Sequence, residues 1–443
     1  MSETTTAQTP SPVCNQKNFR VKAWGLTLVL GLVYLITYTD KILLGLVAQP
    51  LKEEFGLTAS QIGLAGSVFY FAYVIGGLGS GILDKWAGLR WSMVLLSLVW
   101  AACMLPMVFA ASFAVLMASR FVLGLAEGPS ASLVYTAIYS WHPPEKRSLP
   151  GAFVPAASAI AKLLVAPVLT VIIVTWGWRA AFITMALVGT AWCVLWVLTW
   201  SEGPFGKNAD HKGSDTRTIA DRQGKVAWSS IFRTPTFLGG VAAMIAINAL
   251  ISVTLTWLPS YFETGLGFSR LQAGSMFAFP SIAALVALFL ITPISDRLMS
   301  RGTSSRALRG ILPGVALLLS GLSLVVVPYI GIPALVVTVI SIGYGLGTIV
   351  YPQLSAAISQ ICPKPQLAGT LGVFFALMSL GGVLGPVITG KIVDAAISPA
   401  VGYAQAFQLF GIVAVVSAVI TLLTVKPDRD AQRVMSRDGQ EID

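Results

Sequence analysis

Twelve long apolar stretches, separated by short polar segments, run along most of the chain. A helix needs about 20 residues to cross the ~30 Å hydrocarbon layer of a bilayer. The stretches lack the strict alternation of a transmembrane strand, so we expect helices, which satisfy their own backbone polar groups in lipid. Segment 331–361 is long, and we expect it to be tilted or bent at Pro352. The predicted spans are residues 23–47, 60–83, 91–110, 113–139, 149–173, 178–200, 236–258, 270–295, 307–328, 331–361, 367–391 and 402–425.

The composition agrees with a membrane protein. Hydrophobic residues make up 55% of the chain and charged residues 11%, where a soluble domain carries about 25% charged residues. This excludes a disordered chain, a disulfide scaffold and almost any cytosolic enzyme. The four cysteines are far apart and the two histidines fall in loops, so we predict no metal site, no cofactor and no hydrolase triad. We therefore expect a protein that is not an enzyme.

The basic residues predict an orientation. With both termini in the cytoplasm, 22 of the 29 Lys and Arg residues fall in cytoplasmic segments and 4 in outer segments, as expected for a multi-pass protein of a cell inner membrane. The net charge of +10 then lies beside anionic lipid, and we expect no nucleic-acid partner.

The polar stretch 201–235 divides the chain into two halves of six spans. We predict a cytoplasmic tail (1–22), an N-terminal half (23–200), a cytoplasmic linker (201–235), a C-terminal half (236–425) and a second cytoplasmic tail (426–443). Three motifs recur at matching places in the halves, which implies parallel repeats and alternating access to a site near the midplane. The matches are Gly56, Thr58, Gln61 and Gly63 with Gly267, Ser269, Gln272 and Gly274; Asp84-Lys85 with Asp296-Arg297; and Gly177–Phe182 with Gly402–Phe407.

Five charged residues interrupt the predicted spans: Asp40, Lys41, Arg120, Glu127 and Lys162. A charge at the bilayer centre costs about 2.5–3.5 kcal/mol on insertion scales, so such residues face the protein interior and pair. Asp40 and Lys41 point about 100° apart on a helix, whereas Arg120 and Glu127, two turns apart, share one face. A carboxylate there can take up and release a proton as access switches. Two structural alternatives remain open: Asp40-Lys41 marks the end of a shorter helix, or Asp40 and Arg120 form a fixed buried pair.

Lys162 lies too deep in its span to reach either surface. We expect it to be a second ligand for an anion or a partner of Glu127. The alternative is a structural pair with Asp40 or Glu127.

The motifs resemble those of the major facilitator superfamily, and within it the anion:cation symporter family of organic-anion transporters. The similar stretches are Arg120–Pro129 in span 4 and Trp257–Phe262 followed by Gly267 and Ala273-Gly274. The resemblance implies that Asp40 and Glu127 carry the coupled proton. Arg120 is a further candidate for the coupling, with a structural role as the alternative. The resemblance also implies that Lys41, where that family usually has Arg, contacts the substrate carboxylate. Lys keeps the charge but loses the bidentate fork.

Other candidates for the substrate site are polar or aromatic residues within spans. The resemblance implies substrate contact for Tyr73, and Ser379 stands where sugar-acid transporters of that family carry Asn. Losing that amide favours a less polar or aromatic carboxylate over a sugar acid. Tyr70, Gln353 and Asn248 are further candidates, with packing or helix–helix hydrogen bonding as the alternative.

Charged loop residues are predicted to form gates. The resemblance covers the loop 2–3 residues Asp84, Lys85 and Arg90, although Gly88 falls one residue late. Glu145 and Arg147 take the matching place in loop 4–5, and Asp296 and Arg297 are the counterparts in the second half.

We therefore predict an all-α membrane protein of twelve helices that takes up a small organic anion, expected to be a monocarboxylate, together with protons. The energy source is the proton gradient, and we expect a monomer. Exchange of organic anions, or export, remains an alternative because the three cations Lys41, Arg120 and Lys162 outnumber the two acids. A channel or a transceptor is a more distant alternative.

Overall fold

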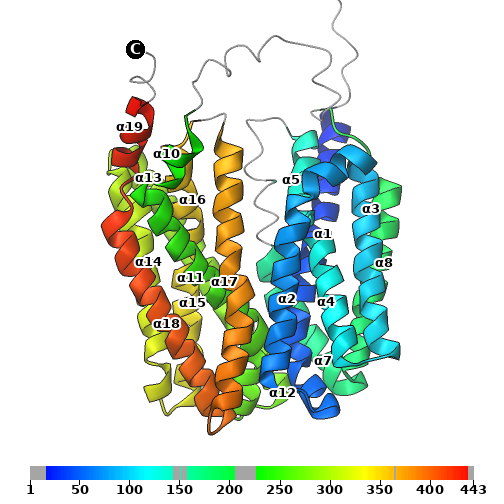
Figure 1. Cartoon of the computed structure of the whole chain (residues 1–443). Helices are drawn as coiled ribbons and strands as arrows, with labels where there is room; N and C mark the ends of the chain where they lie inside the picture. The colour runs from blue at the N-terminus through cyan, green and yellow to red at the C-terminus, as the bar shows by residue number, and fades with distance from the viewer. Residues whose placement is uncertain (1–15, 143–149, 151–156, 205–225, 364–365, 438–443) are drawn as a thin grey trace, which may run out of the picture.

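The computed structural model describes residues 16–142, 150, 157–204, 226–363 and 366–437, and every regular element within these ranges is helical. The N-terminal half contains α1 (Gln16–Phe55), α2 (Ala59–Leu78), α3 (Ser80–Phe109), α4 (Phe113–Glu127), α5 (Ser130–Trp141), η2 (Ala161–Val165), α7 (Ala166–Trp176) and α8 (Trp178–Thr199). The C-terminal half contains α10 (Trp228–Phe232), α11 (Pro235–Ser260), η4 (Tyr261–Gly265), α12 (Arg270–Met276), α13 (Phe279–Ser300), η5 (Ala307–Ile311), α14 (Leu312–Val325), η6 (Val327–Tyr329), α15 (Pro333–Thr348), α16 (Val350–Ile361), α17 (Leu367–Ala395), α18 (Pro399–Thr424) and α19 (Pro427–Arg437). Figure 1 shows the halves side by side.

The described residues form twelve helical segments long and apolar enough to cross a membrane, which confirms the number of predicted spans. The largest difference is in the first span, where α1 continues to Phe55 instead of ending near residue 47. Asp40 and Lys41 therefore lie well inside a continuous helix. The alternative that they mark the end of a shorter helix is wrong.

Two of the interrupted spans break one turn before a proline. A proline has no N–H to donate to the carbonyl four residues earlier, so the helix is broken or bent there. α15 ends at Thr348, four residues before Pro352, and α16 begins after Ile349. The bend expected at Pro352 thus lies one turn before it. In the same way, α12 ends four residues before Pro280.

The internal repeat is visible at the start of α2 and of α12. Gly56 and Gly267 both have positive φ, 61° and 76°, a conformation that favours glycine. Thr58 and Ser269 then cap their helices by accepting a hydrogen bond from the amide of the glutamine three residues later, and each glutamine side chain accepts one from the cap's own amide. This reciprocal capping box stabilises both helix starts.

The third sequence match does not extend to the backbone. Gly177 precedes α8 with a φ of 83°, whereas Gly402 lies within the first turn of α18. The two positions are therefore not equivalent in structure.

The halves approach most closely at the end of the bundle opposite α19 and the start of α1, which we call the far end (Figure 1). A Cβ added to Gly63 of α2 would overlap the carbonyl of Pro386 in α17, and one added to Gly45 of α1 would overlap the carbonyl of Leu255 in α11. Glycine at these positions therefore allows helices from the two halves to meet at their backbones.

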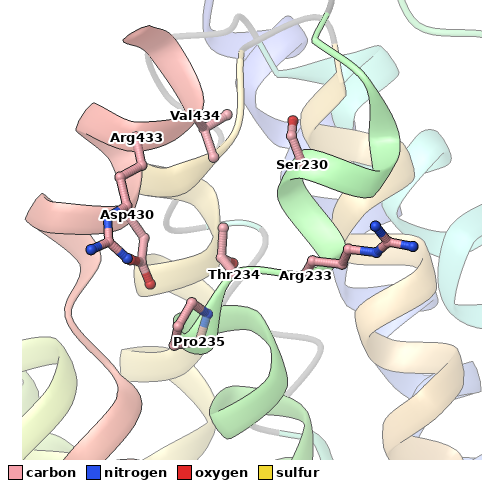
Figure 2. A pocket seen from close by; sticks show the side chains of 7 residues that line it. All are labelled: Ser230, Arg233, Thr234, Pro235, Asp430, Arg433 and Val434. Carbon is pink, nitrogen blue, oxygen red and sulfur yellow. The ribbon is translucent and has the colours of Figure 1, made fainter. Parts of the chain in front are cut away.

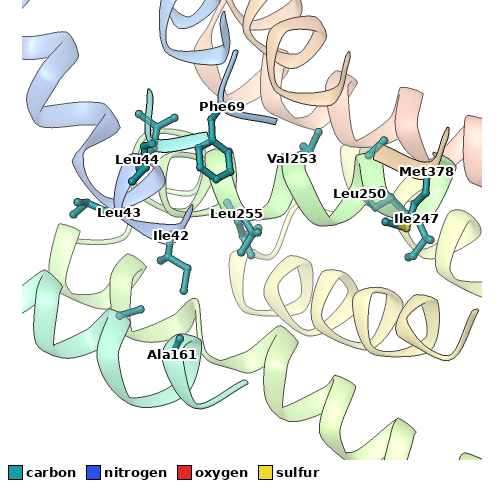
Figure 3. Packing of buried hydrophobic residues seen from close by; sticks show 14 of the residues in the cluster. Ile42, Leu43, Leu44, Phe69, Ala161, Ile247, Leu250, Val253, Leu255 and Met378 are labelled. Carbon is teal, nitrogen blue, oxygen red and sulfur yellow. The ribbon is translucent and has the colours of Figure 1, made fainter. Parts of the chain in front are cut away.

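Apolar side chains fill the space around these contacts. Figure 3 shows this packing, which includes Leu43 of α1, Phe69 of α2 and Leu255 of α11, all buried. Asp40 and Lys41 are carried by α1, so this core also fixes their positions.

Candidate functional site

Four of the five predicted in-span charges form one buried cluster between α1 and α4. Lys41 Nζ lies 3.5 Å from Glu127 Oε2, and their side chains are 10% and 0% exposed. The carboxyl groups of Asp40 and Glu127 are buried neighbours in this cluster and repel each other when both are ionised. Arg120 Nη1 donates to the backbone carbonyl of Asp40 at 3.1 Å. Asp40 and Lys41 point in different directions from α1, as expected for adjacent helix positions, and both side chains lie beside Glu127.

Several polar atoms of this cluster have no hydrogen-bond partner within the described part of the chain. They are Asp40 Oδ1, both carboxylate oxygens of Glu127 and Arg120 Nη2. Buried polar atoms are normally satisfied, so these atoms keep hydrogen-bonding capacity for a proton or a ligand. Arg120 bonds the main-chain carbonyl of Asp40. The alternative of a fixed pair between the two side chains therefore has no hydrogen bond to support it among the described residues.

Aromatic rings surround the ammonium group of Lys41. Its Nζ lies 4.6 Å from the ring centre of Tyr73, 5.2 Å from that of Tyr38 and 5.9 Å from that of Phe69. A cation over the face of such rings is stabilised electrostatically. The sequence predicts Tyr73 as a site residue and misses Tyr38, although Tyr38 precedes Lys41 by three residues, a spacing that places both on one face of a helix.

Lys162 lies outside this cluster and reaches the other half of the protein. It is buried at 7% exposure, and its Nζ donates to the hydroxyl of Tyr344 in α15 at 3.1 Å. The same nitrogen lies 5.9 Å from the ring centre of Tyr38. The structural alternative, a pair with Asp40 or Glu127, is not seen.

The helix that carries Lys162 has an irregular turn. Residues Ala161–Val165 form a π-helix, closed by a bond from the amide of Ala166 to the carbonyl of Ala161. Pro167 follows at once and cannot donate to the carbonyl of Leu163. A π-turn removes the need for that bond, and such turns are frequent at functional sites.

The remaining candidates for substrate contact are engaged by neighbouring helices. The ring of Tyr70 lies against Gly382 of α17, as does the side-chain amide of Asn248. The Asn248 amide donates to the carbonyl of Met378 at 3.2 Å. Ser379 donates to the carbonyl of Phe375 in its own helix.

Gln353 is separate from these residues. It accepts a 3.5 Å bond from Ser295 of α13. Asn248 and Gln353 therefore make the helix–helix hydrogen bonds considered as their alternative.

The predicted gate residues are only partly described. Arg90 donates to the carbonyl of Val197 at 3.0 Å, a contact within the N-terminal half. Arg297 is exposed at the end of α13. The side chains of Asp84, Lys85 and Asp296, and the segment carrying Glu145 and Arg147, lie outside the described residues.

A pocket of about 330 Å³ lies at the end of the bundle opposite the far end, between the linker and α19 (Figure 2). Its walls carry two arginines, Arg233 and Arg433, beside Asp430. This pocket is remote from the ionic cluster and contains none of the predicted site residues. The lining residues are Ser230, Arg233, Thr234, Pro235, Asp430, Arg433 and Val434.

Curated relatives of similar length are transporters of organic anions. The chain is 29% identical to a probable sulfoacetate transporter of Cupriavidus necator, over 92% of this chain and 96% of the relative. It is 28% identical to a probable galactarate/D-glucarate transporter of Bacillus subtilis, over 95% of each chain. It is 24% identical to a D-galactonate transporter of Escherichia coli, over 87% of this chain and 93% of the relative.

Solved structures share the fold at lower identity. A bacterial homologue of the human lysosomal transporter Spinster superimposes with a TM-score of 0.76 at 17% identity, over 94% of this chain and 98% of the other. A D-xylose-proton symporter superimposes with a TM-score of 0.74 at 18% identity, over 92% of this chain and 99% of the other. The family model described as Major Facilitator Superfamily matches residues 30–354 and 305–440. The chain therefore belongs to the major facilitator superfamily, and it is a multi-pass membrane transporter of that family, not an enzyme.

Proposed function

We propose that this protein is a symporter that imports a small organic anion bearing a carboxylate, together with a proton, by alternating access. The observation that carries the proposal is the buried ion pair of Lys41 with Glu127, next to the buried carboxyl group of Asp40. Two neighbouring buried carboxyl groups cannot both be ionised without strong repulsion, and a single shared proton relieves it.

The ion pair between Lys41 and Glu127 links the proton to the substrate. Glu127 in its ionised form holds the ammonium group of Lys41 at 3.5 Å. Protonation of the acid pair removes one negative charge and frees Lys41 to bind a substrate carboxylate. Binding of the proton therefore favours binding of the anion, and by linkage the anion favours the proton.

The close contacts at the far end support alternating access. The backbone approach of α2 to α17 and of α1 to α11 closes one end of the interface between the halves. In the orientation that the basic residues predict, this end faces outward and both termini lie in the cytoplasm. We place the protein in a cell inner membrane, as a monomer.

The substrate class follows from the relatives and from the buried cations. Sulfoacetate, galactarate, D-glucarate and D-galactonate, named for the relatives, are the probes to use first. The expectation of a monocarboxylate treats Lys41 as the main anion ligand, and the buried Lys162 adds a second cation.

Transport into proteoliposomes tests the proposal. An imposed pH gradient, acid outside, is expected to drive accumulation of at least one of the four probes above its external concentration. Glu127→Gln is expected to abolish this accumulation and to retain counterflow, because the variant mimics the protonated acid permanently. Glu54→Gln is the matched control, since Glu54 is bonded to Trp178 and Arg179 of the same half at the far end. Gradient-driven accumulation that persists in Glu127→Gln contradicts the coupling role.

Anion exchange is the second candidate. The excess of buried cations over acids allows one anion to replace another without a proton. If the wild type shows counterflow at full rate but no accumulation under any pH gradient, exchange is favoured. Uptake that does not saturate with substrate concentration would favour a channel.

A further inference from the structure

Lys162 is a buried cation without a carboxylate partner among the described residues. Its described contacts are the hydroxyl of Tyr344 at 3.1 Å and the rings of Tyr344 and Tyr38, 5.1 and 5.9 Å from its nitrogen. None of the ion pairs formed by the described residues includes Lys162. An ammonium group in this position loses its water and gains only these neutral partners, an unfavourable arrangement unless an anion binds beside it.

Lys162 and Lys41 are close enough to hold the two ends of one small molecule. Both nitrogens lie over the ring of Tyr38, at 5.9 and 5.2 Å from its centre, so they are within about 11 Å of each other. A charge-assisted hydrogen bond takes up about 2.7–2.9 Å at each end. This leaves up to roughly 5–6 Å between the acidic oxygens of the ligand, the span of a short diacid.

Tyr344 completes the second binding position. Its hydroxyl oxygen accepts from Lys162, and its own proton remains available to donate to an acidic oxygen. Tyr344 belongs to the C-terminal half and Lys162 to the N-terminal half. An acid group bound there would contact both halves, which is the requirement for a ligand that biases their relative positions.

The charge balance connects this position to the proton. With Asp40 and Glu127 both ionised, Lys41, Arg120 and Lys162 leave an excess of one positive charge, which a monoanion neutralises without any proton. With one proton on the acid pair the excess is two, which a dianion neutralises. Coupling to a proton is therefore more favourable for a dianion than for a monoanion.

We propose that the substrate is a short-chain dianion with two acidic groups, one bound at Lys41 and the other at Lys162 and Tyr344. This inference rests on the proposed function for the position of the first group. It replaces the monocarboxylate of the sequence-based expectation by a diacid whose acidic groups are separated by a few carbon atoms.

Binding to the purified full-length protein tests the inference separately from transport. The probes are the unbranched diacids from malonate to adipate, each compared with its own monoamide, which has the same length and one charge fewer. Affinity is measured from the ligand-dependent shift in thermal unfolding at pH 7. For at least one chain length, the wild type is expected to bind the diacid at least tenfold more tightly than the monoamide.

The variants separate the role of the second charge from a loss of folding. Lys162→Gln is expected to reduce the preference for the diacid to less than twofold, and Lys162→Arg to retain most of it. A wild type that binds no diacid better than its monoamide overturns the inference, and so does an unchanged preference in Lys162→Gln. If the preference depends on Lys162 but no pH gradient drives uptake, the proton coupling fails and the dianion site stands. Proton-driven uptake without any preference for the diacid leaves the coupling intact and rules out the dianion site.

Discussion

Glu53 of α1 and Arg270 of α12 form an ion pair of 2.8 Å that joins the two halves at the far end of the bundle. Arg270 also bonds Glu263 of its own half at 2.9 Å. Close by in the fold, Asp394 at the end of α17 accepts hydrogen bonds from the amides of Ala59 and Ser60, at 2.8 and 2.7 Å. A carboxylate from the C-terminal half thus caps the first turn of α2, in the N-terminal half, where amides and helix dipole both favour a negative charge.

The two contacts are expected to contribute unequally to closure of the far end. Asp394→Asn removes the negative charge beside the N-terminus of α2 and one of its two acceptor oxygens, an effect of about 1 kcal/mol and so a roughly fivefold shift toward the open state. Glu53→Gln removes an exposed ion pair, typically worth about 0.2–1 kcal/mol. Distances between spin labels at the exposed positions Trp176 and Ile397 report the open fraction. A larger shift for Glu53→Gln than for Asp394→Asn would contradict this ranking.

Gly63→Ala is expected to prevent closure of the far end. The new Cβ is fixed rigidly to the backbone of α2 and would overlap the backbone carbonyl of Pro386 in α17, so relief requires the halves to move apart. Overpacking of this kind costs about 1–3 kcal/mol. Counterflow in proteoliposomes is expected to fall at least tenfold. Gly31→Ala is the control, since a Cβ at Gly31 meets nothing within 4 Å, and wild-type transport in Gly63→Ala would show that this contact does not form during the cycle.

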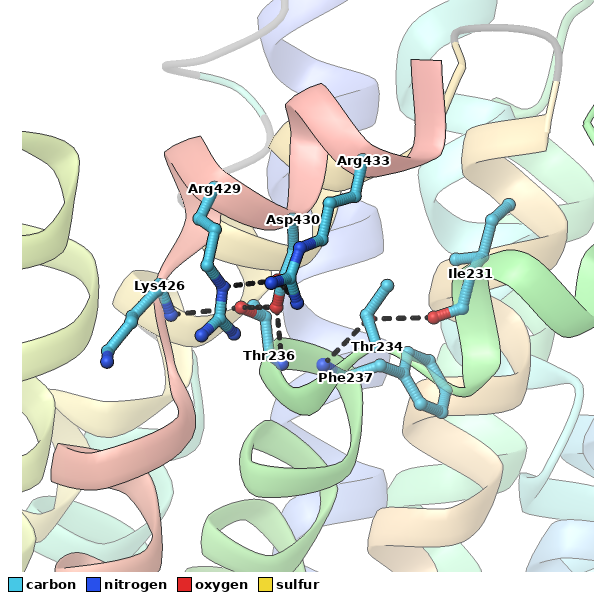
Figure 4. Close-up of polar contacts among 8 residues, drawn as sticks. All are labelled: Ile231, Thr234, Thr236, Phe237, Lys426, Arg429, Asp430 and Arg433. Carbon is cyan, nitrogen blue, oxygen red and sulfur yellow. Dashed lines mark hydrogen bonds and ion pairs between the residues drawn. The ribbon is translucent and has the colours of Figure 1, made fainter. Parts of the chain in front are cut away.

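Asp430 fixes α19 to the start of α11 and gives this contact a pH dependence. Its carboxylate accepts from the amide and hydroxyl of Thr236 at 2.9 and 2.7 Å and from Arg429 Nε at 2.8 Å (Figure 4). Burial alone raises the pKa of Asp430, but the hydrogen bonds from Arg429 and Thr236 outweigh it and hold the pKa below its ordinary value. A depressed pKa means that the ionised form stabilises the folded state.

The stabilisation by Asp430 is therefore complete above the ordinary aspartate pKa of about 3.9 and is lost as the pH falls through the lower pKa of the folded state. At pH 7, Asp430→Asn is expected to weaken the docking of α19 by about 1–3 kcal/mol. Hydrogen exchange of the α19 amides measures this docking. Asp428→Asn is the control, because this carboxylate of the same helix is exposed and the asparagine oxygen can still accept the bond from Gln360. Equal effects of the two variants would argue against a specific role for Asp430.

The features that the sequence predicts well depend on residues close together in the chain. Hydropathy gives the twelve spans, and the capping boxes at Thr58 and Ser269 follow from a four-residue pattern. That Asp40, Lys41, Arg120 and Glu127 lie in the protein interior is predictable because charges inside spans avoid lipid, whereas the pairing of Lys41 with Glu127 is not. The bond between Lys162 and Tyr344, 182 residues apart, depends on how the two halves meet, and no local pattern encodes that. The capping of α2 by Asp394 escapes prediction for the same reason.

The π-helix at Lys162 is expected to position its ammonium group, which can be tested by a change that leaves the charge in place. Pro167→Ala restores an amide that can bond the carbonyl of Leu163, so the turn is expected to become regular. A π-turn contains one residue more than an α-turn, so making it regular rotates the helix before it by about 100° relative to the helix after it. This rotation is expected to move Lys162 away from Tyr344. The preference for a diacid over its monoamide is then expected to fall at least fivefold although Lys162 remains.

Pro313→Ala is the matched control for this variant. Pro313 follows the π-helix Ala307–Ile311 at the same spacing as Pro167 follows its own, and that segment carries none of the buried cations. Its replacement is expected to leave the preference within twofold of wild type. Equal losses in the two variants would indicate a general effect of helix regularity, and an intact preference in Pro167→Ala would mean that the π-turn does not position Lys162.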